Sequence, residues 1–88
     1  MPAVRWYAYL LRCKDGSLYC GITTDLKRRL REHNQGRAGA RYTSGRRPAT
    51  LVFSREFPDR SAAARFEYRL KRLGRAEKLA LIAGQPGA

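Results

Sequence analysis

The fold of this chain is decided by residues 6–23, which read WYAYLLRCKDGSLYCGIT. Aromatic residues are frequent in both halves of this stretch, and they favour β-strands. The Asp15-Gly16 pair between the two halves is a strong turn signal. We therefore predict two strands, residues 6–12 and 18–23, that are joined as a hairpin.

The register of this hairpin depends on the length of its turn. A two-residue turn and a three-residue loop with Gly16 in the left-handed conformation are both common, and the second places Tyr9 opposite Gly21. We favour the three-residue loop because it sorts the apolar side chains better between the two faces. The face expected to cover the core then carries Trp6, Ala8, Leu10, Leu18, Cys20 and Ile22.

A helix signal follows the hairpin directly. Thr24 and Asp25 are residue types that cap helix N-termini, and residues 34–36 are a stop signal. Between them, one stripe of positions at i, i+3, i+4 and i+7 carries Leu26, Arg29, Leu30 and His33. We predict a helix that turns this stripe inward.

The second half of the chain adds one strand and two helices. A loop rich in Gly and Arg, residues 36–48, precedes a predicted strand at residues 50–57. Asp59 or Ser61 caps the next helix, which runs to about Leu73. Gly74 is expected at the C′ position just after that helix. Residues 75–83 are predicted as a short third helix and residues 84–88 as a frayed tail.

The predicted order of elements is β-β-α-β-α-α. It favours an α+β fold in which helices flank a small three-stranded sheet, mixed or antiparallel. With 88 residues, the chain supports a single domain over residues 1–88. One histidine and two cysteines are too few for a structural zinc site, and both thiols are expected to stay reduced.

The net charge of the chain indicates what kind of partner it binds. The chain has 19 Lys+Arg against 7 Asp+Glu, a net charge of +12. This favours a polyanionic partner, nucleic acid first and an anionic membrane surface second. No apolar run approaches the roughly 18 residues that span a bilayer, and residues 1–6 lack a signal-peptide pattern. We therefore expect no membrane span and a cytoplasmic location.

Two residues are unusual on the inward stripe of the first predicted helix. Arg29 needs a partner or a ligand there, unless its stem packs at the margin of the stripe with the charge in water. His33 follows one turn later and is either a structural histidine or part of a site.

Three residue types elsewhere also have two interpretations. Tyr9 and Tyr19 on neighbouring strands are either a packing pair or part of a site. Gly21 destabilises a strand interior, which points to close approach by a ligand or another backbone. Glu67 lies beside the apolar stripe of the second predicted helix, where it either ligates a divalent metal or pairs with an arginine.

Taken in order along the chain, these residues resemble the GIY-YIG nuclease family. Residues 7–9 (Tyr-Ala-Tyr) stand where the family has Gly-Ile-Tyr, and residues 19–21 (Tyr-Cys-Gly) stand for Tyr-Ile-Gly. Residues 21–33 are similar to the family's continuation into its first helix, and residues 66–71 to the segment with its metal-binding Glu. The resemblance covers residues 6–72 and is strongest to small stand-alone bacterial members.

The resemblance implies an endonuclease that hydrolyses phosphodiester bonds with one divalent ion, Mg²⁺ or Mn²⁺. It implies that Glu67 binds the metal and that Arg29 stabilises charge on the phosphoryl oxygens. Tyr9 is a candidate general base, directly or through Tyr19 or His33, and the sequence leaves open which of the three takes the proton. Gly21 belongs to the structural part of the motif.

The resemblance also implies a nucleic-acid substrate, most simply DNA, with branched or damaged repair intermediates as candidates. No separate DNA-binding domain accompanies the motif, so a protein partner is a candidate source of specificity. A non-catalytic DNA- or RNA-binding module is the alternative function, and a membrane-surface or protein-binding role is a third. Seven residues in or near the basic loop are expected to contact the nucleic acid: Lys27, Arg28, Arg37, Arg41, Tyr42, Arg46 and Arg47.

Overall fold

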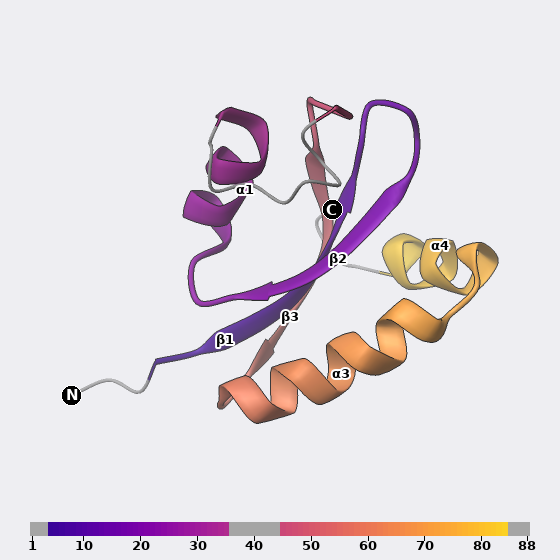
Figure 1. Cartoon of the computed structure of the whole chain (residues 1–88). Coiled ribbons are helices and arrows are strands. Elements are labelled where there is room, and N and C mark those ends of the chain that lie inside the picture. Colours follow the sequence, from indigo (N-terminus) through magenta and orange to yellow (C-terminus); the bar gives the residue numbers. More distant parts are fainter. Residues whose placement is uncertain (1–3, 36–44, 85–88) are drawn as a thin grey trace.

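A computed structural model describes residues 4–35 and 45–84 (Figure 1). The order β-β-α-β-α-α that the sequence predicts is confirmed. The strands and helices are β1 (Trp6–Arg12), β2 (Leu18–Thr23), α1 (Leu26–Gln35), β3 (Thr50–Phe57), α3 (Arg60–Arg72) and α4 (Arg75–Ala83). No helix among the described residues is long and apolar enough to cross a membrane.

The three strands form one antiparallel sheet with the order β2-β1-β3. The predicted three-residue loop is present, because Gly16 has φ +86° and Tyr9 lies opposite Gly21. A register shift between Leu10 and Leu11 interrupts the pairing of β1 with β3. The central strand β1 therefore holds Tyr9 between two neighbouring strands.

Both faces of the sheet are buried, whereas the sequence predicted one core face. Leu10 and Phe53 contact α3 and α4, as expected for that face. The opposite face is also covered, because Leu26 and Leu30 of α1 pack against Tyr9 and its neighbours. Figure 1 shows α1 on one side of the sheet and α3 with α4 on the other. The prediction was incomplete because the second face, with Tyr9 and Leu11, is itself apolar enough to support a helix.

The helix caps decide where α1 and α3 begin. The Asp25 carboxylate accepts a hydrogen bond of 3.0 Å from the backbone N–H of Arg28, which fixes the first turn of α1. Asp59, and not Ser61, caps α3, since its carboxylate accepts from Ala62 N–H at 2.8 Å. These caps place the functional stripe of α1 directly after β2.

Gly74 stands at the predicted C′ position after α3, but without the left-handed conformation that is usual there. Leu73 is the C-cap of α3, and Gly74 has φ −70°, so it is not in the left-handed region. Its N–H donates to the Glu77 carboxylate at 3.0 Å, which makes it the N-cap of α4. A glycine between two helices serves either helix equally well by sequence, and the Glu three residues later decides for the second.

Candidate active site

Tyr9 occupies the middle of β1, and only 2% of the residue is exposed. Its ring lies against the Cα of Gly21 on β2. A Cβ built at Gly21 would overlap the Tyr9 hydroxyl and lie 2.6 Å from the ring carbon Cζ. The close approach expected at Gly21 is therefore made by the Tyr9 side chain. Glycine at this position allows the phenol to extend across β2.

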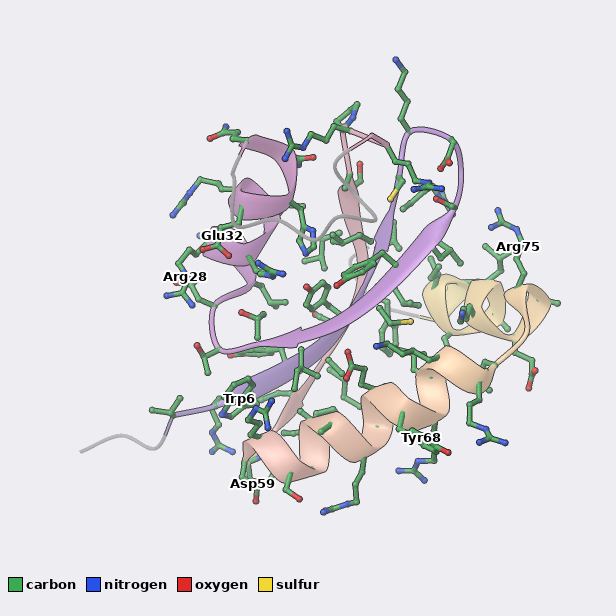
Figure 2. The ribbon with its side chains drawn as sticks, in the orientation of Figure 1. Trp6, Arg28, Glu32, Asp59, Tyr68 and Arg75 are labelled. Atoms are coloured by element: carbon green, nitrogen blue, oxygen red, sulfur yellow. The ribbon has the colours of Figure 1, made fainter. Side chains whose placement is uncertain are left out.

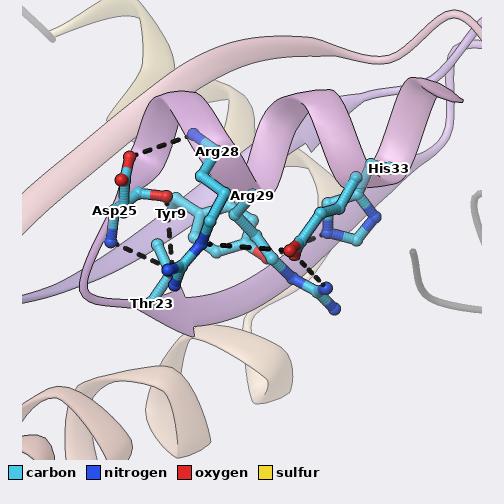
Figure 3. A network of polar contacts seen from close by, with 7 residues as sticks. Tyr9, Thr23, Asp25, Arg28, Arg29 and His33 are labelled. Carbon is cyan, nitrogen blue, oxygen red and sulfur yellow. Dashed lines mark hydrogen bonds and ion pairs between the residues drawn. The ribbon is translucent and has the colours of Figure 1, made fainter. Parts of the chain in front are cut away.

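The Tyr9 hydroxyl lies 3.0 Å from Nε2 of His33, the buried histidine of α1 (Figure 3). Burial raises the pKa of Tyr9 to about 12, against the lowering effect of a hydrogen bond from Arg29. Burial and the nearby Arg29 charge lower the pKa of His33 to about 4. Both groups are therefore neutral near pH 7. The two side chains therefore share one hydrogen bond between neutral groups, and the tautomer of His33 sets its direction.

Arg29 combines the two arrangements that the sequence left open. Its guanidinium hydrogen-bonds the Tyr9 hydroxyl and also lies 3.0 Å from a carboxylate oxygen of Glu32. About a quarter of its side chain, 25%, is still exposed. The charge thus contacts the buried phenol, while part of the side chain remains accessible to an anion from solvent.

Tyr19 completes a cluster of three rings. Its centroid lies 5.0 Å from that of His33 in an edge-on arrangement and 6.5 Å from that of Tyr9. Such aromatic contacts stabilise by about 0.5–1.5 kcal/mol beyond burial. Tyr19 is partly exposed, so it lies between the buried Tyr9–His33 pair and the solvent.

Sequence reasoning missed the role of Glu32, which is not one of the four residues of the predicted stripe. Glu32 contacts Arg29 at i,i+3 and also Arg28, at 3.9 Å and i,i+4. This spacing was the signal that could have found it. Glu32 therefore positions Arg29 and lowers the net charge that α1 offers to a ligand.

Glu67 comes from a different element than the side chains of the Tyr9–His33–Arg29 cluster. It belongs to α3 on the other side of the sheet, and its carboxylate lies 3.4 Å from Nζ of Lys71. The negative charge of Glu67 nevertheless acts on Tyr9. Burial is the main cause of the raised pKa of Tyr9, and the Glu67 charge raises it further to a smaller extent. Its side chain is 20% exposed, so the carboxylate reaches solvent.

The donor set suits a hydrated ion better than an enclosed metal site. No group of three or more His, Cys, Asp or Glu side chains gathers anywhere in residues 4–35 and 45–84. Mg²⁺ and Mn²⁺ are bound through one or two carboxylates while they keep several waters and take phosphate oxygens from the substrate. A single, partly exposed carboxylate such as Glu67 fits that requirement.

The basic residues expected to contact nucleic acid are divided by the structure. Lys27 and Arg28 are exposed on α1. Arg46 pairs with Asp15 at 3.0 Å, and Arg47 donates from Nε to the backbone carbonyl of His33 at 2.7 Å. The three remaining residues lie outside the described part of the chain: Arg37, Arg41 and Tyr42.

The neutral His33 predicts a pH-dependent stability. The folded-state pKa of about 4 lies below the ordinary value of 6.5, so the unfolded chain binds the proton more readily between these values. Lowering the pH from 6.5 to 4 should therefore remove about 3 kcal/mol of folding free energy. Urea unfolding at a series of pH values measures this loss.

The control for this experiment is His33→Gln, which removes the only histidine of the chain. Carboxylates also titrate in this range, and the variant keeps them all. The variant should therefore show a shallower pH dependence between pH 6.5 and 4. Parallel curves for the two proteins would contradict the assignment of a buried, neutral His33.

Comparison with known proteins places this cluster in a wider context. A family model described as the GIY-YIG catalytic domain matches residues 5–80. A UPF0213 protein of Nitratidesulfovibrio vulgaris is 54% identical over 78 residues, which cover 89% of this chain and 70% of the relative.

Two solved structures are similar to this chain over most of its length. The solution structure of a UPF0213 protein of Bacillus halodurans matches with a TM-score of 0.60 and 44% identity, covering 94% of this chain and 87% of that one. The solution structure of a protein of E. faecalis matches with a TM-score of 0.61 and 41% identity, covering 90% and 83%. The α+β architecture is therefore shared with proteins solved independently.

Proposed function

Because the chain belongs to the GIY-YIG family, we propose that it is a metal-dependent endonuclease that hydrolyses phosphodiester bonds of DNA. The observation that carries this proposal is the contact of Tyr9, His33 and Arg29 in one cluster between α1 and the sheet. It joins a proton donor, a proton acceptor and a permanent positive charge. These are groups that phosphodiester hydrolysis requires.

Arg29 has the role of charge stabilisation. Attack of water on a phosphodiester places negative charge on the phosphoryl oxygens, and a planar guanidinium can donate two parallel hydrogen bonds to them. Glu32 and Tyr9 hold the guanidinium from one side, which leaves the exposed part for the phosphate. Because Arg29 is held before substrate arrives, little reorganisation is needed in the transition state.

Tyr9 and His33 have the role of moving the proton of the attacking water. A free phenolate is disfavoured, since burial raises the pKa of Tyr9 to about 12. A relay avoids it: the Tyr9 oxygen receives the proton from water as the Tyr9 proton passes to Nε2 of His33. His33 is then an imidazolium beside Arg29, which makes the proton easy to release afterwards. Tyr19, which is more accessible, is the alternative entry point for the proton.

Glu67 is the residue that would hold the metal ion. When Mg²⁺ or Mn²⁺ is bound there, it supplies Lewis-acid stabilisation of charge on the leaving oxygen. Lys71 competes for the same carboxylate at 3.4 Å. Because the Lys71 side chain is 58% exposed, it can swing into solvent at little cost and release the carboxylate.

We also propose a cytoplasmic enzyme that acts on branched or damaged repair intermediates, with a protein partner supplying specificity. Both cysteines are free thiols, in keeping with a reducing compartment. Lys27 and Arg28 on α1 offer exposed charge beside the cluster, and phosphate contacts of this kind position DNA without reading its sequence.

The test is a cleavage assay with labelled linear, nicked, flap and junction DNA and with RNA. Scission is expected in Mg²⁺ or Mn²⁺ and not in chelator, and Glu67→Gln should abolish it while DNA binding persists. The matched control is Glu56→Gln, the same change at a carboxylate on β3 that pairs with Arg5 and is 50% exposed. Salt-dependent binding without scission of any substrate would instead establish a non-catalytic binding module.

A further inference from the structure

A second basic surface lies on α3, away from the candidate active site. The positions 60, 61, 64, 65, 68, 69 and 72 recur at helical spacing and form the face opposite the buried Ala63 and Leu70. Four arginines occupy this outer face, which runs for about 20 Å along the helix: Arg60, Arg65, Arg69 and Arg72. Figure 2 shows Tyr68 projecting from α3 on the side away from the sheet.

The charge on this outer face is not neutralised within the described part of the chain. All seven acidic side chains lie in that part, and each is engaged elsewhere: Asp15 with Arg46, Asp25 and Asp59 in helix caps, Glu32 with Arg28 and Arg29, Glu56 with Arg5, Glu67 with Lys71, and Glu77 with Gly74 N–H. The contacts of the α3 arginines are with uncharged groups instead. Arg65 donates to the Ser61 hydroxyl, Arg72 donates to the Tyr68 hydroxyl, and Arg60 lies over the ring of Trp6. This distinguishes α3 from α1, where Arg28 and Arg29 share Glu32.

An aromatic ring stands among these charges. Tyr68 is 62% exposed, and Nη1 of Arg72 donates to its hydroxyl at 2.8 Å, which holds the ring upright. The small residues Ser61 and Ala64 lie between the long side chains, so the outer face is hollowed along its length. The hollow is lined by Arg60, Ser61, Ala64, Arg65, Tyr68 and Arg69.

We propose that the outer face of α3 is a docking track for single-stranded nucleic acid, separate from the cluster on α1. The arginines would contact successive phosphates, and Tyr68 would stack on an unpaired base. The small side chains of Ser61 and Ala64 in the hollow leave room for the nucleic-acid backbone to approach the helix. Tyr68 is the sole large apolar side chain exposed on this face of the described chain, which gives a membrane surface little to insert and favours nucleic acid.

This docking track goes beyond hydrolysis at the α1 cluster. It lies on the face of α3 that is turned away from the sheet, opposite the buried Ala63 and Leu70, so a strand bound there is held away from Arg29 on α1. The track would therefore retain the unpaired part of a substrate, such as a flap, and its action does not depend on whether the α1 cluster cleaves.

The test is binding of the full chain to a labelled single-stranded 20-nucleotide DNA and to the matching duplex, in chelator. The variant is Arg65→Gln with Arg69→Gln. Loss of two phosphate contacts should reduce the slope of log affinity against log salt by about 1.4 and weaken single-strand binding about tenfold at 0.1 M salt. Tyr68→Ala should weaken single-strand binding about fivefold and leave duplex binding unchanged, and Tyr68→Phe should retain affinity.

The matched control is Arg12→Gln with Lys14→Gln, which removes the same charge from exposed residues of the β1–β2 hairpin. It should change the single-strand affinity less than the α3 variant does. Equal weakening by the two double variants would reduce the effect to net charge and overturn the track. If Tyr68→Ala bound single strands as tightly as the unmodified protein, the assignment to single strands would be wrong. If the Arg65→Gln, Arg69→Gln variant lost binding to phosphatidylserine vesicles but kept its binding to nucleic acid, nucleic acid would be wrong as the partner. Because the assay contains chelator, its outcome is separate from that of the cleavage experiment.

Discussion

Replacement of Arg29 by alanine is expected to lower the rate of DNA cleavage by at least about 100-fold. The guanidinium is a permanent charge that contacts the buried phenol of Tyr9, and 25% of the Arg29 side chain is exposed and can meet a phosphate. Arg29→Lys should also fail to restore full activity, since an ammonium group lacks the planar fork that holds Tyr9, Glu32 and a phosphate together. Single-turnover cleavage in Mg²⁺ or Mn²⁺ measures both variants.

The fold should survive this replacement. The Tyr9 hydroxyl keeps its 3.0 Å contact with His33, and Glu32 keeps Arg28 as a partner. Arg31→Ala is the matched control, because Arg31 is exposed on the same helix and its replacement removes the same charge. If Arg29→Ala cleaved like the unmodified protein, or if Arg31→Ala lost as much activity, the assignment of Arg29 to catalysis would be wrong.

Gly21→Ala is expected to destabilise the protein by about 1–3 kcal/mol and to lower cleavage, because the added methyl group displaces Tyr9. The new Cβ would lie 2.6 Å from Cζ of Tyr9 and 3.0 Å from Cε1. The phenol has little room to move, since it is 2% exposed and bonded to His33. Urea unfolding measures the loss of stability, and the cleavage assay measures the loss of activity that follows from displacing the Tyr9 hydroxyl.

Two further variants isolate the cause of this effect. Gly45→Ala is the matched control, because a Cβ at Gly45 meets nothing within 4 Å. In a Tyr9→Leu background, Gly21→Ala should cost much less, since the ring that it overlaps is gone. Additive losses in the double variant would show that the strand backbone, and not the Tyr9 ring, requires glycine.

Much of the fold could be predicted because local signals agreed. Asp15-Gly16 marked the turn, and the sorting of apolar side chains between the two faces selected the register. Asp25 marked the start of α1, and Asp59 was one of two candidate caps for α3. The burial of both faces of the sheet was missed, because period-two alternation cannot indicate a second covered face when both sets of residues are apolar. Gly74 stands at its predicted C′ position, and its second role as the N-cap of α4 was missed because glycine suits either end of a helix.

The candidate site was predictable in its residue types and less so in its contacts. Helical spacing placed Arg29 and His33 on one stripe, and the structure brings both to Tyr9. The pairing of Arg29 with Glu32 depends on side-chain direction, which periodicity does not give. Glu67 comes from a helix on the other side of the sheet, and its position relative to Tyr9 depends on how α3 packs, which no local pattern specifies.

The position of Tyr9 on the middle strand has a consequence for motion. Edge strands and helix ends exchange their amide hydrogens through small local openings, whereas a strand paired on both sides opens only when most of the molecule does. The backbone of β1 around Tyr9 is flanked by β2 and β3 and should therefore belong to the slowest-exchanging core. The phenol is then attached to the part of the molecule that fluctuates least, while Arg29 and Tyr19 reach it from elements that open more often.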